Sequence, residues 1–299
     1  MKTLLLTDPM PAALFADAIA ALAPEVSLLA HRRDIGDDEL ADVEVVLGWR
    51  LPPGLAPRMP KLRWVCSIAA GVEKLMPADL PAHIPVSRIV DAEQAEGIAQ
   101  FAVLMALRHA RALPRYEAQQ LQRQWVRHPV AAVRRRVTVL GMGAAGGVVA
   151  RLLGAVGFEV KGWSRRSGGD LDTLLKASDI VVCALPLTPD TQGLLNARRL
   201  ALLPRGSYLI NIARGGHVVE SDLIAAVRSG HLAGAALDVQ EREPMSADDP
   251  LWAVPGITIT PHIAAQSSVA TIATQFVEGW RALLRGQVLP RLVDRAAGY

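Results

Sequence analysis

The stretch Arg136-Val137-Thr138-Val139-Leu140-Gly141-Met142-Gly143-Ala144-Ala145-Gly146 decides the fold of this chain. A short, mostly apolar run leads directly into a Gly-x-Gly-x-x-Gly turn, and an Ala-, Val- and Leu-rich helical stretch follows. In such a unit the first glycine permits a tight turn, the second lets a pyrophosphate approach the backbone, and the third lets helix and strand pack closely. The phosphate lies at the positive end of the helix. The context predicts a dinucleotide site, although the glycine pattern alone would equally fit a structural turn.

The residues after this turn alternate between strand-like and helical segments. Six strand candidates occur at 137–141, 159–163, 180–185, 208–212, 234–239 and 257–260. The first ninety residues alternate in the same way, with strand candidates at 3–7, 26–29, 43–47, 62–66 and 86–89. Such alternation is typical of parallel βα units.

Two amphipathic helices are predicted to connect these parts, at 95–112 and at 269–284, and the second is expected to return to the first domain. We therefore predict an α/β protein with two doubly wound parallel-sheet domains. A Rossmann cofactor domain spans 92–265, and a smaller, flavodoxin-like substrate domain combines 1–91 with 266–299.

The composition excludes several functional classes. The chain is 51% hydrophobic and 20% charged, as in globular proteins, and its 32 basic and 29 acidic residues favour no nucleic-acid partner. The basic run Arg134-Arg135-Arg136 is interpreted as a solvated strand entrance. No apolar stretch approaches the roughly 18 residues of a membrane span. Cys66 and Cys183 lie in apolar runs, which predicts buried reduced thiols and a cytoplasmic location. No metal-ligand spacing occurs, so no metal site is predicted.

The tip of the second strand of the predicted cofactor domain indicates which dinucleotide binds. An NAD-preferring site carries Asp or Glu there for the ribose 2'-hydroxyl, but this chain has Ser164-Arg165-Arg166. A carboxylate would repel a 2'-phosphate, whereas guanidinium groups bind it bidentately. We predict NADPH, with NADH as a weaker substitute. If both arginines only solvate a loop, the choice of cofactor stays open.

Three polar residues follow successive strands at the edge where open α/β sheets bind their ligands. Arg214 could hold a substrate carboxylate and orient the neighbouring carbonyl. His262 could donate the proton that a reduced carbonyl oxygen requires, and Glu243 could keep the imidazolium protonated. Each residue alone is equally well explained as a surface ion or a loop histidine, but together they favour catalysis.

The segment 114–130 interrupts the α/β alternation. It is polar and amphipathic, with Leu121 and Trp125 four residues apart on one helical face. A tryptophan exposed in such an arm predicts contact with a second subunit, hence a homodimer.

The sequence resembles the D-2-hydroxyacid dehydrogenase family over essentially its whole length. The resemblance rests on the glycine turn and, in order and spacing, on Asn211-Ile212-Ala213-Arg214-Gly215-Gly216, Leu237-Asp238-Val239 with Glu243-Pro244, and Thr260-Pro261-His262-Ile263-Ala264-Ala265. Within the family it is most similar to the glyoxylate/hydroxypyruvate reductase A type, through Gly162-Trp163-Ser164-Arg165 and Pro250-Leu251-Trp252.

The resemblance implies NADPH-dependent reduction of glyoxylate to glycolate and of hydroxypyruvate to D-glycerate. It also implies that the stretch Ile68-Ala69-Ala70-Gly71-Val72 holds the substrate carboxylate on backbone amides at a helix start, with Ala70 and Gly71 in contact with it. Trp49 is implied near the substrate, although a packing role is an equal alternative.

The same resemblance implies a catalytic trio of Arg214, Glu243 and His262. The implied cofactor contacts are Gly141, Gly143, Ala145, Gly146, Ser164, Arg165, Arg166, Leu185, Pro186, Thr191, Ile212, Ala213, Asp238, His262 and Ala264. Two alternatives stay open at this level: a related dehydrogenase with another keto acid, and a non-enzymatic dinucleotide-sensing scaffold. The physiological keto acid and the role of the tail that ends in Tyr299 are not predicted.

Overall fold

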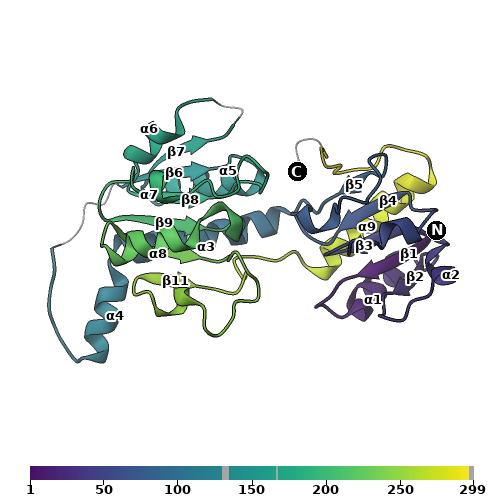
Figure 1. The fold of residues 1–299 in the computed structure, drawn as a ribbon, viewed down its shortest axis with the longest axis horizontal. Coiled ribbons are helices and arrows are strands. Elements are labelled where there is room, and N and C mark those ends of the chain that lie inside the picture. Colours follow the sequence, from purple (N-terminus) through teal and green to yellow (C-terminus); the bar gives the residue numbers. More distant parts are fainter. Residues whose placement is uncertain (130–134, 166–167, 296–299) are drawn as a thin grey trace. The chain divides into compact units, whose positions relative to one another are not determined.

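The computed structural model describes residues 1–129, 135–165 and 168–295. The chain divides into two compact units, Met1–Asp91 with Gln266–Tyr299, and Ala92–Ala265. Each unit contains one sheet in which every strand pair is parallel, and helices lie on both faces of each sheet (Figure 1). The predicted fold class is thereby confirmed. Within the described residues, none of the helices combines the length and the apolar character needed to cross a bilayer.

The first unit has the strand order β2-β1-β3-β4-β5, which is the flavodoxin-like order. Its strands are β1 (Lys2–Leu6), β2 (Ser27–Ala30), β3 (Val43–Gly48), β4 (Trp64–Ser67) and β5 (Val86–Ser87). Its helices are α1 (Ala12–Leu22), α2 (Asp37–Leu40) and α9 (Val269–Leu284), with 3-10 turns η1 (Ala56–Arg58) and η2 (Glu73–Leu75).

Alternation along β1 explains why this sheet has a core on each face. Leu4 belongs to one apolar cluster and Leu5 to the other, because successive strand side chains point to opposite faces. On the Leu5 side, Trp64 of β4 stacks on Phe276 of α9 with ring centroids 5.5 Å apart. The predicted return of the last helix to the first domain is therefore correct.

The second unit has the strand order β11-β10-β9-β8-β6-β7. Its strands are β6 (Arg136–Leu140), β7 (Glu159–Trp163), β8 (Ile180–Cys183), β9 (Ser207–Asn211), β10 (Leu232–Leu237) and β11 (Ile257–Ile259). Its helices are α3 (Ala92–Ala110), α4 (Leu113–Leu121), α5 (Ala144–Ala155), α6 (Leu171–Lys176), α7 (Ala197–Leu200) and α8 (Glu220–Arg228), with 3-10 turns η3 (Gly215–His217) and η4 (Pro250–Ala253).

Strand alternation again places apolar side chains on both faces of this sheet. Val137 and Val139 face the cluster that contains α3 and α5, whereas Leu140 faces the cluster beneath α6 to α8. All six predicted strands are present with ends shifted by at most two residues. The predicted helix at 95–112 runs instead from Ala92 to Ala110.

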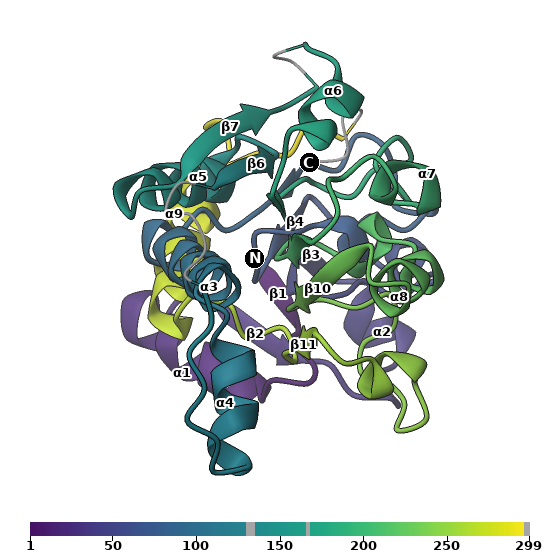
Figure 2. The same ribbon diagram turned by 90° about the vertical axis from the view of Figure 1, so that its left-hand side faces the viewer.

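Helix α4 forms the first part of the predicted arm and projects away from the sheet of its unit (Figure 2). Pro114 lies in its first turn, where the missing amide proton costs no hydrogen bond. None of the nine residues of α4 is buried. The prediction of an exposed tryptophan is confirmed, because Trp125 is 96% exposed.

Two further predictions concern charged and thiol side chains. Arg136 pairs with Asp179 at 2.9 Å and Arg135 contacts His109 at 3.1 Å, while Arg134 lies outside the described residues. Cys66 and Cys183 are free and buried as predicted, and burial raises the pKa of each thiol to about 12.

Candidate active site

The glycine turn has the geometry that its sequence predicts. Gly141 adopts φ +96°, and a Cβ there would lie 2.5 Å from the carbonyl oxygen of Ala184. At Gly146 a Cβ would lie 1.8 Å from the carbonyl oxygen of Gly141, so only glycine allows α5 to pack so closely on the turn. A Cβ at Gly143, the N-cap of α5, would meet nothing within 4 Å. The start of this helix therefore has room for a pyrophosphate, whose charge suits the helix dipole.

Ser164 and Arg165 follow the end of β7, one strand away from the glycine turn in the sheet. Arg165 Nη1 lies 2.7 Å from Asp190 Oδ2, in the loop after β8. Both side chains are solvent-accessible, so the ion pair is weak and a phosphate can compete for the guanidinium. Asp190 was missed at the sequence level, where only its place in the loop after β8 could have indicated it. Arg166 lies outside the described residues.

Arg214, Glu243 and His262 follow the carboxyl ends of β9, β10 and β11, which are neighbours in the sheet. His262 Nδ1 lies 3.0 Å from Glu243 Oε2. The other carboxylate oxygen of Glu243 accepts a hydrogen bond from the backbone amide of Gln240 at 3.1 Å. The predicted pairing of Glu243 with His262 is thus present in the structure, with both side chains partly exposed.

Asp238 fixes the loop that carries His262. Its carboxylate is 1% exposed and accepts hydrogen bonds from the Thr260 hydroxyl at 2.6 Å and from the amides of Ile263 and Ala264, each at 2.9 Å. These three donors satisfy a buried charge that would otherwise be costly. His262 itself adopts φ +55°, and its amide donates to the Asp238 carbonyl at 2.8 Å. The structure therefore places Asp238 against the backbone of the His262 loop.

The backbone around Arg214 is held by side chains of the same unit. Asn211 Nδ2 donates to the Arg214 carbonyl at 2.9 Å, and Arg214 Nη1 donates to the Ala213 carbonyl at 2.7 Å. Ile212 and Ala213 are buried beside it, at 8% and 7% exposure. These hydrogen bonds fix the backbone of Arg214 at the end of β9.

The loop after β8 contains three of the predicted cofactor contacts. Leu185 is buried, and the Thr191 hydroxyl donates to the Pro186 carbonyl at 2.8 Å while it accepts from the Thr188 amide at 2.8 Å. Thr191 is 1% exposed, so its hydroxyl shapes the loop from within.

The predicted substrate residues of the first unit lie on two neighbouring loops. Ser67 Oγ donates to the Gly71 carbonyl at 2.9 Å and accepts from the Ala69 amide at 3.0 Å. The amides of Ala70 and Gly71 donate to no acceptor within the part of the chain that the structure describes. The expected helix start is absent, because only the three-residue turn η2 follows. An anion could therefore gain from these amides but not from a helix dipole.

Trp49 follows β3 and packs partly against the core of the first unit. Lys74 of η2 places its ammonium 5.4 Å from the centroid of the indole ring, a cation–π contact. Trp49 is therefore a packing residue that also contacts a cation.

Comparisons with known proteins show which family the chain is similar to. Residues 103–264 match the family model of the D-isomer specific 2-hydroxyacid dehydrogenase NAD binding domain. A glyoxylate/hydroxypyruvate reductase A of Serratia proteamaculans is 36% identical over 283 residues, which cover 88% of this chain and 90% of that protein.

Two solved structures are similar over nearly their whole length. A D-isomer specific 2-hydroxyacid dehydrogenase from Xanthobacter autotrophicus, in complex with NADPH and MES, superposes with a TM-score of 0.89 at 37% identity, covering 100% of this chain and 99% of that one. An NADPH-dependent glyoxylate/hydroxypyruvate reductase from Sinorhizobium meliloti, in complex with NADP and sulfate, has a TM-score of 0.89 at 30% identity and the same coverage. The resemblance inferred from the sequence is confirmed, and this chain belongs to the D-isomer specific 2-hydroxyacid dehydrogenase family.

Proposed function

We propose that this protein reduces small 2-keto acids with NADPH, converting glyoxylate to glycolate and hydroxypyruvate to D-glycerate. The observation that carries the proposal is the His262–Glu243 pair at 3.0 Å, beside Arg214 on the neighbouring strand end. A proton donor with an anionic partner next to a guanidinium is the set of groups that carbonyl reduction of an anionic substrate needs. Relatives named for glyoxylate and hydroxypyruvate reduction support the choice of substrates.

In this reaction Arg214 binds the substrate carboxylate and orients the adjacent carbonyl. NADPH, when bound, would supply the hydride for the carbonyl carbon. His262 donates a proton to the carbonyl oxygen, which becomes the hydroxyl of the product. Glu243 accepts a hydrogen bond from Nδ1, and this fixes the ring orientation and stabilises the imidazolium before proton transfer. The ring then recovers a proton from solvent.

The cofactor is assigned to the unit 92–265. Gly141, Gly143, Ala145 and Gly146 form the pyrophosphate turn, and Ser164 and Arg165 favour a 2'-phosphate over a bare ribose. NADH is expected to bind more weakly. The remaining proposed contacts, which follow strands of the same sheet, are Leu185, Pro186, Thr191, Ile212, Ala213, Asp238, His262 and Ala264.

Within the unit 1–91 with 266–299, the loop at Ala70 and Gly71 is proposed as a carboxylate-binding element. The amides of Ala70 and Gly71 support this, since the hydroxyl of Ser67 already organises their loop. Lys74 above Trp49 adds positive charge to the same region, which suits an anionic substrate.

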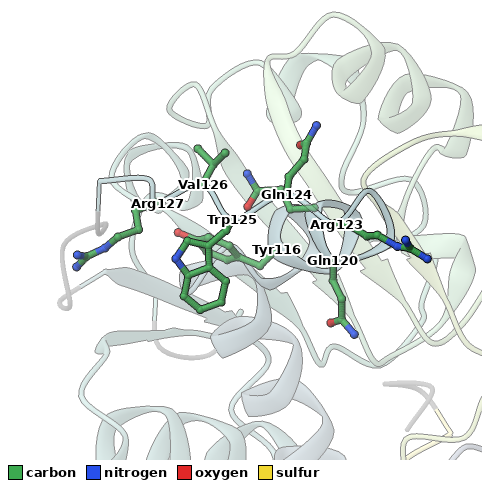
Figure 3. Close-up of a pocket in the computed structure, with 8 residues that line it drawn as sticks. Tyr116, Gln120, Arg123, Gln124, Trp125, Val126 and Arg127 are labelled. Carbon is green, nitrogen blue, oxygen red and sulfur yellow. The ribbon is translucent and has the colours of Figure 1, made fainter.

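A homodimer formed through the arm is the proposed assembly. Leu121 is 88% exposed and Trp125 is 96% exposed. Leu121 is the last residue of α4, which contains no buried residue, and Trp125 follows four residues later. A pocket on this arm is lined by Tyr116, Gln119, Gln120, Arg123, Gln124, Trp125, Val126 and Arg127 (Figure 3). A second copy could cover this apolar surface with its own arm. We also propose a cytoplasmic location, which suits two buried free thiols.

The test follows NADPH and NADH oxidation with glyoxylate, hydroxypyruvate and pyruvate. Wild type is expected to oxidise NADPH with glyoxylate and hydroxypyruvate faster than NADH, and His262→Asn should lose about a hundredfold or more in kcat. His83→Asn, an exposed histidine of the other unit, is the matched control. Equal inertness of wild type and His262→Asn, with NADPH still bound, would favour the scaffold alternative.

A further inference from the structure

We infer that His217 is a positioning residue that links Arg214 to the loop after β8. One ring nitrogen contacts the backbone of Arg214, and the other contacts the backbone of the loop. His217 Nδ1 lies 2.9 Å from the Arg214 carbonyl oxygen, and Nε2 lies 3.2 Å from the Pro186 carbonyl oxygen. The side chain is completely buried. The inference rests on the proposed function, which assigns Arg214 to the substrate and Pro186 to the cofactor.

Each of these carbonyls also accepts hydrogen bonds from its own segment, and for the Arg214 carbonyl one of these comes from the His217 backbone amide at 3.3 Å. Asn211 Nδ2 donates to the Arg214 carbonyl at 2.9 Å, and the Thr191 hydroxyl donates to the Pro186 carbonyl at 2.8 Å. Asn211 and Thr191 thus fix the two segments separately. The imidazole of His217 is the group that contacts both carbonyls.

The backbone of η3 is attached to the same loop and keeps the ring in place. The Leu195 amide donates to the His217 carbonyl at 2.9 Å, and the Gly193 amide donates to the Gly216 carbonyl at 2.8 Å. The ring therefore cannot follow Arg214 away from the β8 loop without breaking these bonds. A shift of about 1 Å in a substrate-binding group can cost a large factor in rate, so this attachment matters for the reaction.

Because both acceptors are carbonyl oxygens, the two contacts are hydrogen bonds at the same time only when the ring carries a proton on each nitrogen. Carbonyl oxygens only accept hydrogen bonds, whereas an imidazole ring donates from Nδ1, from Nε2, or from both when it is protonated. At a buried site an unmade hydrogen bond has no water to replace it. Removal of one donor position should therefore loosen one segment and leave the other in place.

Two substitutions separate the contacts. The amide nitrogen of asparagine reaches the position of histidine Nδ1, and that of glutamine reaches the position of Nε2. His217→Asn keeps the donor to Arg214, so we expect the KM for NADPH to rise about tenfold and the KM for glyoxylate to change less than about twofold. His217→Gln keeps the donor to Pro186, so we expect the opposite split. His217→Phe should raise both KM values.

The matched controls are His231→Asn and His231→Gln. His231 Nε2 also contacts a backbone carbonyl, that of Leu200, at 3.2 Å, but on neither predicted site segment. These variants should show no split. If His217 had a merely structural role, the Asn and Gln variants would both have a lower Tm, and both KM values would change together in each. That result, or no change in either KM, overturns the inference.

The readout distinguishes this inference from the proposed function. NADPH affinity is also measured directly by tryptophan fluorescence, which tests the cofactor half without turnover. If wild type binds NADPH but reduces no keto acid, the proposed function fails, while a weaker binding confined to His217→Asn still supports the link to the β8 loop. If wild type is active and the two variants behave identically, only the inference fails.

Discussion

His262 Nδ1 and Glu243 Oε2 lie 3.0 Å apart although the residues belong to loops after different strands, β11 and β10. The second oxygen of Glu243 is held by the Gln240 amide at 3.1 Å, so the carboxylate is oriented before it meets the ring. This prior orientation is what a proton donor needs, because the ring need not reorganise during the reaction.

Removal of the charge on Glu243 should therefore slow the chemical step. Glu243→Gln keeps the size of the side chain but no longer stabilises an imidazolium, and we expect kcat with glyoxylate to fall about ten- to a hundredfold. The KM for NADPH should change little. Steady-state kinetics provide the measurement, with the exposed neighbour substitution Glu241→Gln as the control. Full activity of Glu243→Gln would remove Glu243 from the mechanism.

The Arg165–Asp190 ion pair predicts opposite effects on cofactor choice. Arg165→Asp places a carboxylate where the 2'-phosphate is expected, so the KM for NADPH should rise about tenfold or more while that for NADH changes little. Asp190→Asn keeps the guanidinium and removes its competing anion, so the KM for NADPH should fall about twofold. Kinetics with both cofactors at two salt concentrations provide the measurement. Equal effects on NADPH and NADH would contradict a 2'-phosphate site.

The glycine turn predicts a contrast between folding and binding. Gly146→Ala forces a Cβ against the Gly141 carbonyl, and we expect a loss of about 2–4 kcal/mol in the free energy of unfolding. Gly143→Ala meets no atom within 4 Å, so its stability should match wild type, but its methyl should weaken NADPH binding. Urea unfolding and NADPH titration measure the two effects. An unfolding midpoint of Gly143→Ala as low as that of Gly146→Ala would disprove the assignment of open space at Gly143.

His109 predicts the pH dependence of stability. Burial, and secondarily the charge of Arg135, lowers its pKa from 6.5 to about 4. The unfolded state therefore binds a proton more readily than the folded state as the pH falls. The associated stability is complete above about pH 6.5 and is lost as the pH falls towards 4, about 2 kcal/mol of it by pH 5.

The variant His109→Phe tests this pH dependence. Phenylalanine keeps a ring against Tyr208, where the imidazole now stacks at 4.4 Å between centroids, but it cannot be protonated. Urea unfolding of His109→Phe should lose less stability between pH 7 and pH 5 than wild type by about 2 kcal/mol. The exposed residue His83 provides the matched control variant, His83→Phe.

The arm predicts a change of assembly. Trp125→Ala and Leu121→Ser remove the most exposed apolar side chains of the arm, so we expect a dimer to become a monomer in analytical ultracentrifugation at low micromolar concentration. Loss of a fully exposed side chain costs a monomer little folding stability, so these substitutions should not lower the Tm of the monomer. A wild-type monomer would contradict the proposed assembly directly.

The sequence by itself determined in which order strands, turns and helices follow one another along the chain. It also determined the residue types at the end of each strand. The apolar run before Gly141 and the spacing to Ser164 predict a strand, a turn and a second strand, because these signals are local. For the same reason Arg214, Glu243 and His262 could be assigned to one sheet edge, since the carboxyl ends of parallel strands share an edge.

Only the tertiary structure decided which side chains meet there. The structure pairs Arg165 with Asp190, 25 positions away, and His217 with Pro186, 31 positions away. No periodicity in the sequence encodes such pairs. The absence of an α-helix after Gly71, where only the three-residue turn η2 follows, is likewise visible only in the structure. Local chemistry therefore determined the groups in the site, whereas long-range packing decided how each group is oriented.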